Sequence, residues 1–129
     1  MLEPGMKNTE EVLCTAENTA IALGSGSVAV FATPAMISLM EGTAAHSVAD
    51  RLDEKQTTVG TALDVSHIAA TPVGMKIRCE SELIAVDGRA LTFKVTAFDE
   101  AGKIGEGTHG RFIVDAEKFV SKANAKLSE

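Results

Sequence analysis

The 129-residue sequence contains no tryptophan, no tyrosine and only two cysteines, and its net charge at pH 7 is -6. Cys14 and Cys79 are far apart and lack metal-ligand spacing, so reduced thiols in a cytoplasmic protein are expected rather than a disulfide scaffold or a metal site. The chain has no basic stripe with interleaved aromatic residues, which argues against a nucleic-acid partner. An anionic ligand would therefore have to meet a local basic feature.

Membrane and targeting segments are also lacking. The start of the chain shows no positively charged stretch followed by an apolar core and a cleavage site, so no secretory signal is expected. The longest nearly uncharged stretch, residues 18–49, mixes its apolar residues with Ser, Thr and Gly and does not resemble a membrane span. With 45% hydrophobic residues and no linker, residues 1–129 are expected to form one domain.

A helix over residues 34–50 is predicted to organise the rest of the chain. The Thr33-Pro34 pair is typical of a helix start, because the hydroxyl can cap free N–H groups and proline is tolerated in the first turn. Apolar residues occupy most of the helix circumference, which indicates a helix surrounded by protein. Glu41 stands among them and needs either a partner or a function, unless it lies on a single wet edge.

Alternating residues predict four antiparallel strands after this helix. The first covers residues 56–67, with His67 on one face and Gly60 and Asp64 on the other. Turns at residues 70–74, at Asp87-Gly88 and at residues 99–102 separate the later strands, the last of which covers 104–114. Residues 10–17 predict an earlier strand and residues 18–27 a mobile loop or lid, while Asp115 is expected to cap a short closing helix.

These elements predict an α+β fold in which a five-stranded antiparallel sheet wraps around one long buried helix, with a short C-terminal helix. Because a sheet covers only part of such a helix, its remaining flank needs other protein. A second copy of the chain is the natural cover, so we expect a homodimer.

Several motifs occur together and in order. They are Val30-Phe31-Ala32-Thr33, Glu41 eight residues after Thr33, the strand from Gly60 to His67 followed by Ala69-Ala70-Thr71-Pro72-Val73-Gly74, and Gly105-Glu106-Gly107-Thr108-His109-Gly110-Arg111. Over residues 30–119 they resemble the fluoroacetyl-CoA thioesterase group of hotdog-fold acyl-CoA thioesterases. The resemblance implies a hotdog dimer with its active site at the subunit interface, an acyl-CoA substrate and no cofactor or metal.

The same resemblance implies that Thr33, Glu41 and His67 are catalytic and that Gly60 and Arg111 bind or shape the substrate. The group's fluoroacetyl-specific member carries a phenylalanine-bearing lid before the helix. Here residues 20–29 are small and contain no aromatic side chain, so the resemblance leaves the acyl group undetermined.

The chemistry of these residue types agrees with thioester hydrolysis, which needs a nucleophile, a general acid/base and oxyanion donors. His67 titrates near neutral pH and can move the proton. Glu41 can orient the imidazolium, act as the base or attack the carbonyl, and the sequence leaves these roles open. Thr33 offers a hydroxyl near free helix N–H groups, and Gly60 lets a thioester approach the strand backbone.

Structural explanations compete with these roles. Thr33 can be only a helix cap, Gly60 can mark only a bulge, and Arg111 can be an ordinary strand-end charge. Two further histidines, His109 beside Arg111 and His46 on the helix, are weaker candidates, and Asp64 is left out because it alternates away from His67. We expect hydrolysis of a small acyl-CoA; the alternative is a binding module that holds such a ligand without turnover.

Overall fold

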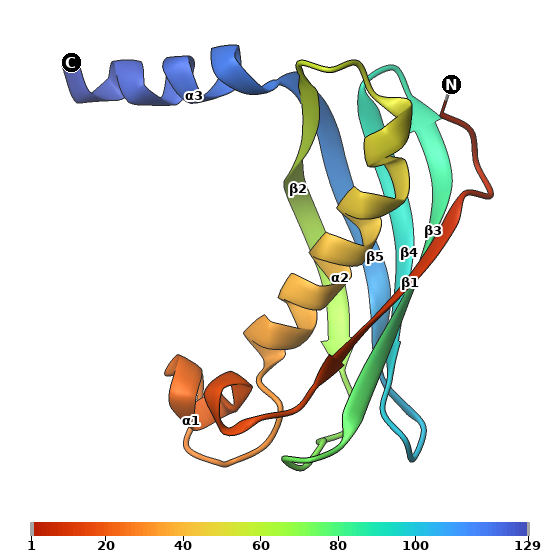
Figure 1. Cartoon of the computed structure of the whole chain (residues 1–129), viewed down its shortest axis with the longest axis vertical. Helices are drawn as coiled ribbons and strands as arrows, with labels where there is room; N and C mark the ends of the chain where they lie inside the picture. Colours follow the sequence, from red (N-terminus) through yellow and green to blue (C-terminus); the bar gives the residue numbers. More distant parts are fainter. Residues whose placement is uncertain (1, 129) are drawn as a thin grey trace.

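The computed structural model describes residues 2–128 and confirms the α+β architecture, with one long helix lying across one face of a curved antiparallel sheet (Figure 1). The strands, in sheet order, are β1 (Lys7–Leu13), β3 (Lys76–Asp87), β4 (Ala90–Phe98), β5 (Lys103–Asp115) and β2 (Gln56–His67). The helices are η1 (Ala16–Asn18), α1 (Ala20–Leu23), α2 (Thr33–Val48), η2 (Ala49–Arg51), α3 (Ala116–Asn124) and η3 (Ala125–Ser128). The strands β1 and β2 form the two edges of the sheet.

The long helix α2 begins differently from the prediction. Its N-cap is Ala32, which has no side chain that could cap, and Thr33 is already the first helical residue. Pro34 follows inside the first turn, where its missing N–H costs nothing. The predicted capping role of Thr33 is therefore wrong, and its hydroxyl is free for another partner.

One face of α2 packs on the sheet, and its opposite flank is not surrounded within a single chain. Met36, Met40 and Val48 are fully buried, while Ser38 and His46 on the other side are exposed. The sheet thus covers only one face of the helix within one chain, and the cover of the other flank by a second copy stays a prediction. The core combines the helix face with the inward residues of the strands: Cys14, Phe31, Met36, Met40, Ala44, Val48, Ile77, Cys79, Leu83, Leu91, Phe93, Val95, Ala97, Ile104 and Ile113.

A β-bulge in β2 changes which residues face the helix. Gly60 pairs with Arg111 of β5 and Ala62 pairs with Gly110, so Thr61 is an extra residue that reverses the alternation. Gly60 and His67, predicted on opposite faces, consequently both point toward α2. The alternative that Gly60 marks a bulge is confirmed.

The other predicted strands and turns agree closely with the structure, except at the start. The turns at Asp87-Gly88 and at residues 99–102 are present, with Gly88 in the left-handed region at φ 62°. The first strand runs over Lys7–Leu13 rather than 10–17, because its register against β3, with Leu13 opposite Lys76, sets its ends. The predicted loop over residues 18–27 contains the short helix α1.

The C-terminal helix α3 begins as predicted, with the Asp115 side chain accepting a hydrogen bond from the Lys118 backbone N–H at 3.0 Å. It extends away from the sheet (Figure 1), and Phe119 and Val120 remain exposed. Among residues 2–128 no helix has both the length and the apolar character needed to cross a membrane.

Candidate active site

Thr33 and His67 form a hydrogen-bonded pair where α2 begins and β2 ends. The Thr33 Oγ1 and His67 Nδ1 atoms are 2.8 Å apart. Burial of the ring lowers the pKa of His67, with a smaller opposing effect from the backbone of Ala69. The imidazole is therefore neutral at pH 7. Its other nitrogen, Nε2, is buried and has no hydrogen-bond partner of normal geometry within residues 2–128, so the pair combines a hydroxyl with a base whose second nitrogen is unused.

A pocket of about 330 Å³ opens beside this pair. Small or apolar residues from the segment before α2 and from the segment after β2 form most of its wall. The lining residues are Ala20, Ser25, Gly26, Val28, Val30, Phe31, Thr33, His67, Ile68, Ala69 and Ala70. None of them carries a permanent charge, which suits an uncharged ligand group.

Glu41 lies two turns further along α2 and faces a second polar cluster. Its Oε2 atom is 3.5 Å from Arg111 Nη1 and 4.0 Å from His109 Nε2. Gly60 makes room for this carboxylate, because a Cβ atom at that position would lie only 2.5 Å from Glu41 Oε2. The glycine thus has a steric reason to be there, since any side chain would displace Glu41.

The Arg111 side chain is held mainly by Thr58 and His109. Its Nε donates to Thr58 Oγ1 and its Nη2 donates to the Thr58 carbonyl, both at 2.8 Å. Nη1 is directed at His109 Nε2, at 3.1 Å, and at Glu41. Burial lowers the pKa of Arg111, while the nearby Glu41 charge raises it. Because an arginine remains protonated even so, Arg111 supplies a fixed positive charge beside the carboxylate.

The structure therefore arranges the five predicted site residues as two clusters. Thr33 and His67 form one, and Glu41, Gly60 and Arg111 form the other. Thr33 and Glu41 are eight residues apart on α2, which corresponds to about 12 Å along the helix axis. Within residues 2–128, no hydrogen bond or ion pair joins Glu41 to Thr33 or His67.

Comparison with known proteins identifies the family. The model of the family FlK, the fluoroacetyl-CoA-specific thioesterases, matches residues 14–117. The chain belongs to this family. It is 41% identical over 97 residues to the fluoroacetyl-CoA thioesterase of Streptantibioticus cattleyicolor, an alignment that covers 75% of this chain and 70% of the relative. The protein is thus a thioesterase, as its motifs suggested.

Solved structures of the fluoroacetyl-CoA thioesterase FlK share the fold. One has a TM-score of 0.93 at 33% identity and covers 98% of both chains. A threonine-to-serine mutant of FlK in complex with acetyl-CoA has a TM-score of 0.92 at 34% identity, covering 97% of this chain and 98% of FlK. A Thermus thermophilus hypothetical protein of the thioesterase superfamily, at 24% identity and TM-score 0.88, covers 99% of this chain and 94% of its own, and supports the hotdog fold alone.

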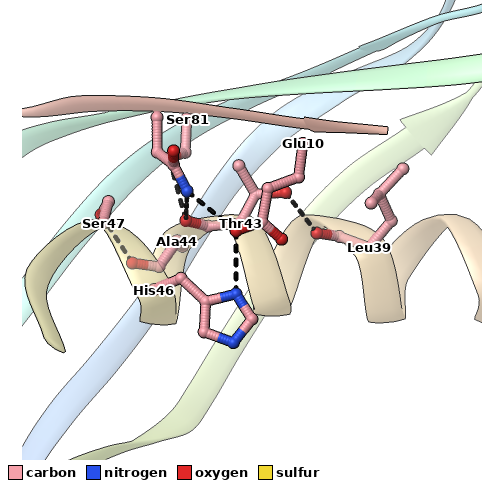
Figure 2. Close-up of polar contacts among 8 residues, drawn as sticks. Glu10, Leu39, Thr43, Ala44, His46, Ser47 and Ser81 are labelled. Carbon is pink, nitrogen blue, oxygen red and sulfur yellow. Dashed lines mark hydrogen bonds and ion pairs between the residues drawn. The ribbon is translucent and has the colours of Figure 1, made fainter. Parts of the chain in front are cut away.

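His46 of this thioesterase lies outside both clusters. Its Nδ1 is 2.8 Å from Glu10 Oε2 of β1, on the flank of α2 opposite β2 (Figure 2). Asn8 also donates to Glu10 and to the Thr43 carbonyl, at 3.0 and 3.1 Å. The His46 side chain is 67% exposed. These contacts tether the edge strand β1 to the helix.

His109 belongs to the Glu41 cluster, although the sequence ranked it as a weak candidate. It is 1% exposed, and its Nδ1 is 2.9 Å from the Ala62 carbonyl. One signal was visible in the sequence, because His109 and Arg111 are two residues apart on one strand and must share a face. The sequence did not show that His109 and Arg111 both face Glu41. Within residues 2–128 no cluster of three metal-binding side chains is found.

Proposed function

We propose that this thioesterase hydrolyses the coenzyme A thioester of a small, uncharged acyl group to the free acid and coenzyme A, with Thr33, Glu41 and His67 as its catalytic residues. The observation that carries the proposal is the Thr33–His67 hydrogen bond of 2.8 Å on the wall of an uncharged pocket. A hydroxyl, a neutral imidazole and a carboxylate together provide the acid/base groups that thioester hydrolysis requires.

The path of the proton during hydrolysis follows from the positions of these residues. A water oxygen attacks the thioester carbonyl, the C–S bond breaks, and the proton lost by water passes through neutral His67 to the departing thiolate. Thr33 Oγ1 meets the imidazole at Nδ1, so a proton can move between the hydroxyl and the ring at the pocket wall. The free N–H groups of the first turn of α2 carry partial positive charge close to this point. As the base, Glu41 first accepts the proton of water, which then passes through His67. As the nucleophile, Glu41 attacks the carbonyl, the C–S bond breaks to give an acyl anhydride and the thiolate, and water then hydrolyses the anhydride, with its proton passing through His67 to the thiolate.

Two chains would bring the two clusters together. Strand β2 is long and lies at the sheet edge, where an unpaired ladder favours strand addition. The register that we propose is an antiparallel pairing of two β2 strands centred between Leu63 and Asp64, which would set residue 60 of one chain beside residue 67 of the other. Glu41, which lies over Gly60, then approaches the partner subunit's His67. Leu63, 41% exposed, would be covered by the same contact, so we propose a homodimer with two composite sites.

The acyl group is expected to be small and neutral. The pocket wall offers no cation to a second carboxylate, and the Arg111 donors are directed mainly to Thr58, His109 and Glu41. Relatives are named for fluoroacetyl-CoA, and FlK has been solved with acetyl-CoA. Acetyl, fluoroacetyl and short branched acyl groups are therefore the candidate substrates, whereas dicarboxylic acyl groups are expected to be excluded.

The decisive test measures free-thiol release from acetyl-, fluoroacetyl-, isobutyryl-, benzoyl- and succinyl-CoA by the wild-type enzyme and by His67→Ala. Turnover of at least one small neutral substrate, with kcat reduced about a hundred-fold or more in the variant, is the expected result. Equal turnover by both proteins would disprove the role of His67. Saturable binding without thiol release from any substrate would favour a non-catalytic acyl-CoA-binding module.

A further inference from the structure

The Arg111 guanidinium has its orientation fixed by several contacts at once. Two bonds to Thr58 hold the Nε and Nη2 edge, and the bond to His109 Nε2 holds Nη1. Nη1 is also the Arg111 atom that forms the ion pair with Glu41 Oε2, at 3.5 Å. The direction in which Nη1 presents its two N–H bonds therefore determines where the carboxylate is most stable, because charge-assisted hydrogen bonds are strongly directional.

His109 is held as one particular neutral tautomer. Its Nδ1 faces the Ala62 carbonyl at 2.9 Å, and a carbonyl can only accept, so Nδ1 carries the hydrogen. Its Nε2 faces a guanidinium N–H and therefore presents a lone pair. Burial is the largest effect on the pKa of His109 and lowers it; the hydrogen bond to Ala62 opposes this, the charge of Arg111 lowers the pKa further, and the charge of Glu41 raises it least. A second proton on Nε2 would also point at an N–H of Arg111.

The carbonyl that accepts the hydrogen bond from His109 belongs to Ala62, which lies at the β-bulge of β2. Ala62 directly follows the extra residue Thr61, at the point where the pairing of β2 with β5 resumes opposite Gly110. The same bulge places Gly60 under Glu41. The bulge thus includes both Gly60, which lies next to the Glu41 carboxylate, and Ala62, whose carbonyl accepts the hydrogen bond from His109.

We propose that His109 is a positioning residue for catalysis: anchored on the Ala62 carbonyl, it accepts an N–H from Arg111 and fixes the guanidinium that holds Glu41 over Gly60. This inference rests on the catalytic role proposed for Glu41. It gives Arg111 the task of aligning a catalytic carboxylate. It also gives His109, which touches no substrate, an effect on turnover rather than on substrate binding.

Two substitutions distinguish the role of the His109 Nδ1 atom from that of the Nε2 atom. His109→Gln reaches far enough to offer an acceptor at the place of Nε2, whereas His109→Asn is shorter and keeps only a donor at the place of Nδ1. We expect His109→Gln to retain kcat within about three-fold, and His109→Asn to lose about ten-fold in kcat with KM unchanged, which is the cost of one lost charge-assisted hydrogen bond. Melting temperatures of both variants serve as the control for folding.

Thr58→Val provides an independent variant if His109→Asn does not fold. It removes the hydroxyl that accepts from Arg111 Nε at the other edge of the guanidinium. The same selective loss in kcat is expected, because the guanidinium is again released from one side. Full kcat in a folded Thr58→Val enzyme would argue against the alignment of Arg111 as a factor in turnover.

Other outcomes overturn the proposal. Equal losses in the Gln and Asn variants, in proportion to losses in melting temperature, would mean that His109 only packs the core. A rise in KM alone would place His109 at the substrate. Glu41→Gln is assayed in parallel: full turnover in that variant would sink the proposed role of Glu41, whereas an inactive Glu41→Gln enzyme beside a fully active His109→Asn enzyme would overturn the positioning role alone.

Discussion

The two flanks of α2 each bring a carboxylate close to a histidine, and the two pairs are built differently. On the β1 flank, His46 and Glu10 are 2.8 Å apart, with side chains 67% and 31% exposed. On the β2 flank, His109 and Glu41 are 4.0 Å apart, with the His109 side chain fully buried and the Glu41 side chain 40% exposed. The closer pair is the more solvated one.

Separation alone therefore does not identify a functional pair. An exposed ion pair contributes little, because water screens it and two side chains must be ordered. A buried group has to be satisfied by specific partners, and those partners fix its geometry. The β1 flank thus ties a strand to a helix, whereas on the β2 flank the buried His109 and Arg111 are fixed and face the partly exposed Glu41 carboxylate.

Removing one carboxylate from each flank tests this comparison most strongly. Glu41→Gln is expected to lower kcat about a thousand-fold, within the range for loss of an acid/base group, while the fold persists. The matched control Glu10→Gln should leave kcat unchanged and shift the free energy of unfolding by about 1 kcal/mol at most. Thiol release and thermal melts report both quantities, and equal activity in the two variants would refute the distinction between the flanks.

Adding one methyl group beside Glu41 is expected to have the next largest effect. In Gly60→Ala the new Cβ would lie 2.5 Å from Glu41 Oε2 and 3.3 Å from His109 Cε1. The carboxylate end can move aside, so the protein should fold, yet a displacement of about 1 Å in an active site can cost about a hundred-fold in rate. Steady-state kinetics with a melting control would measure this, and unchanged kcat would show that Glu41 does not need its present position.

The pH dependence of stability should come in part from the buried histidines. Burial lowers the pKa of His67 and of His109 below the usual value of about 6.5. As the pH falls below that value, the unfolded chain takes up protons that the folded chain refuses, so the fold loses stability; above it, these groups have no effect. Melts at pH 7.5 and 5.5 should show this loss, and His109→Gln should reduce it. An identical loss in that variant would exclude His109 as a source.

The smallest expected effect lies on the β1 flank. In Gly42→Ala the new Cβ would meet only ordinary contacts, 3.8 Å from His46 Cε1 and 4.0 Å from Glu10 Oε1. Alanine is preferred over glycine inside a helix, so the free energy of unfolding should rise by about 0.5 to 1 kcal/mol with kcat unchanged. Chemical denaturation measures the difference; a loss of activity here would mean that the β1 flank also contributes to function.

Most of the fold could be predicted because local patterns and tertiary contacts agree. The alternation in β4 and β5, the Asp87-Gly88 turn and the Asp115 cap all appear where the sequence indicates them. The errors fall where contacts outside the segment decide. The ends of β1 depend on its register with β3, and the N-cap of α2 is Ala32, which leaves the hydroxyl of Thr33 without the predicted capping role.

The sequence named candidate site residues, and it did not show how they are arranged. Thr33, Glu41 and His67 were predicted as one constellation, and the single chain keeps Glu41 apart from the other two. His109 was underrated because a lone histidine on a strand carries no signal of what it faces. The sequence indicated the bulge at Thr61 only indirectly, because Gly60 could mark either a bulge or a substrate-binding position.

The sequence by itself determined the α+β order, the long helix with its stranded carboxylate, and the family motifs, because these depend on residue type and short-range spacing. Tertiary structure alone decided which groups share a surface. One extra residue in β2 turns Gly60 and His67 to the same face, and pairing of β2 with β5 brings Arg111 and His109 under Glu41. Such contacts join residues far apart in the chain, and no local pattern encodes where their side chains meet.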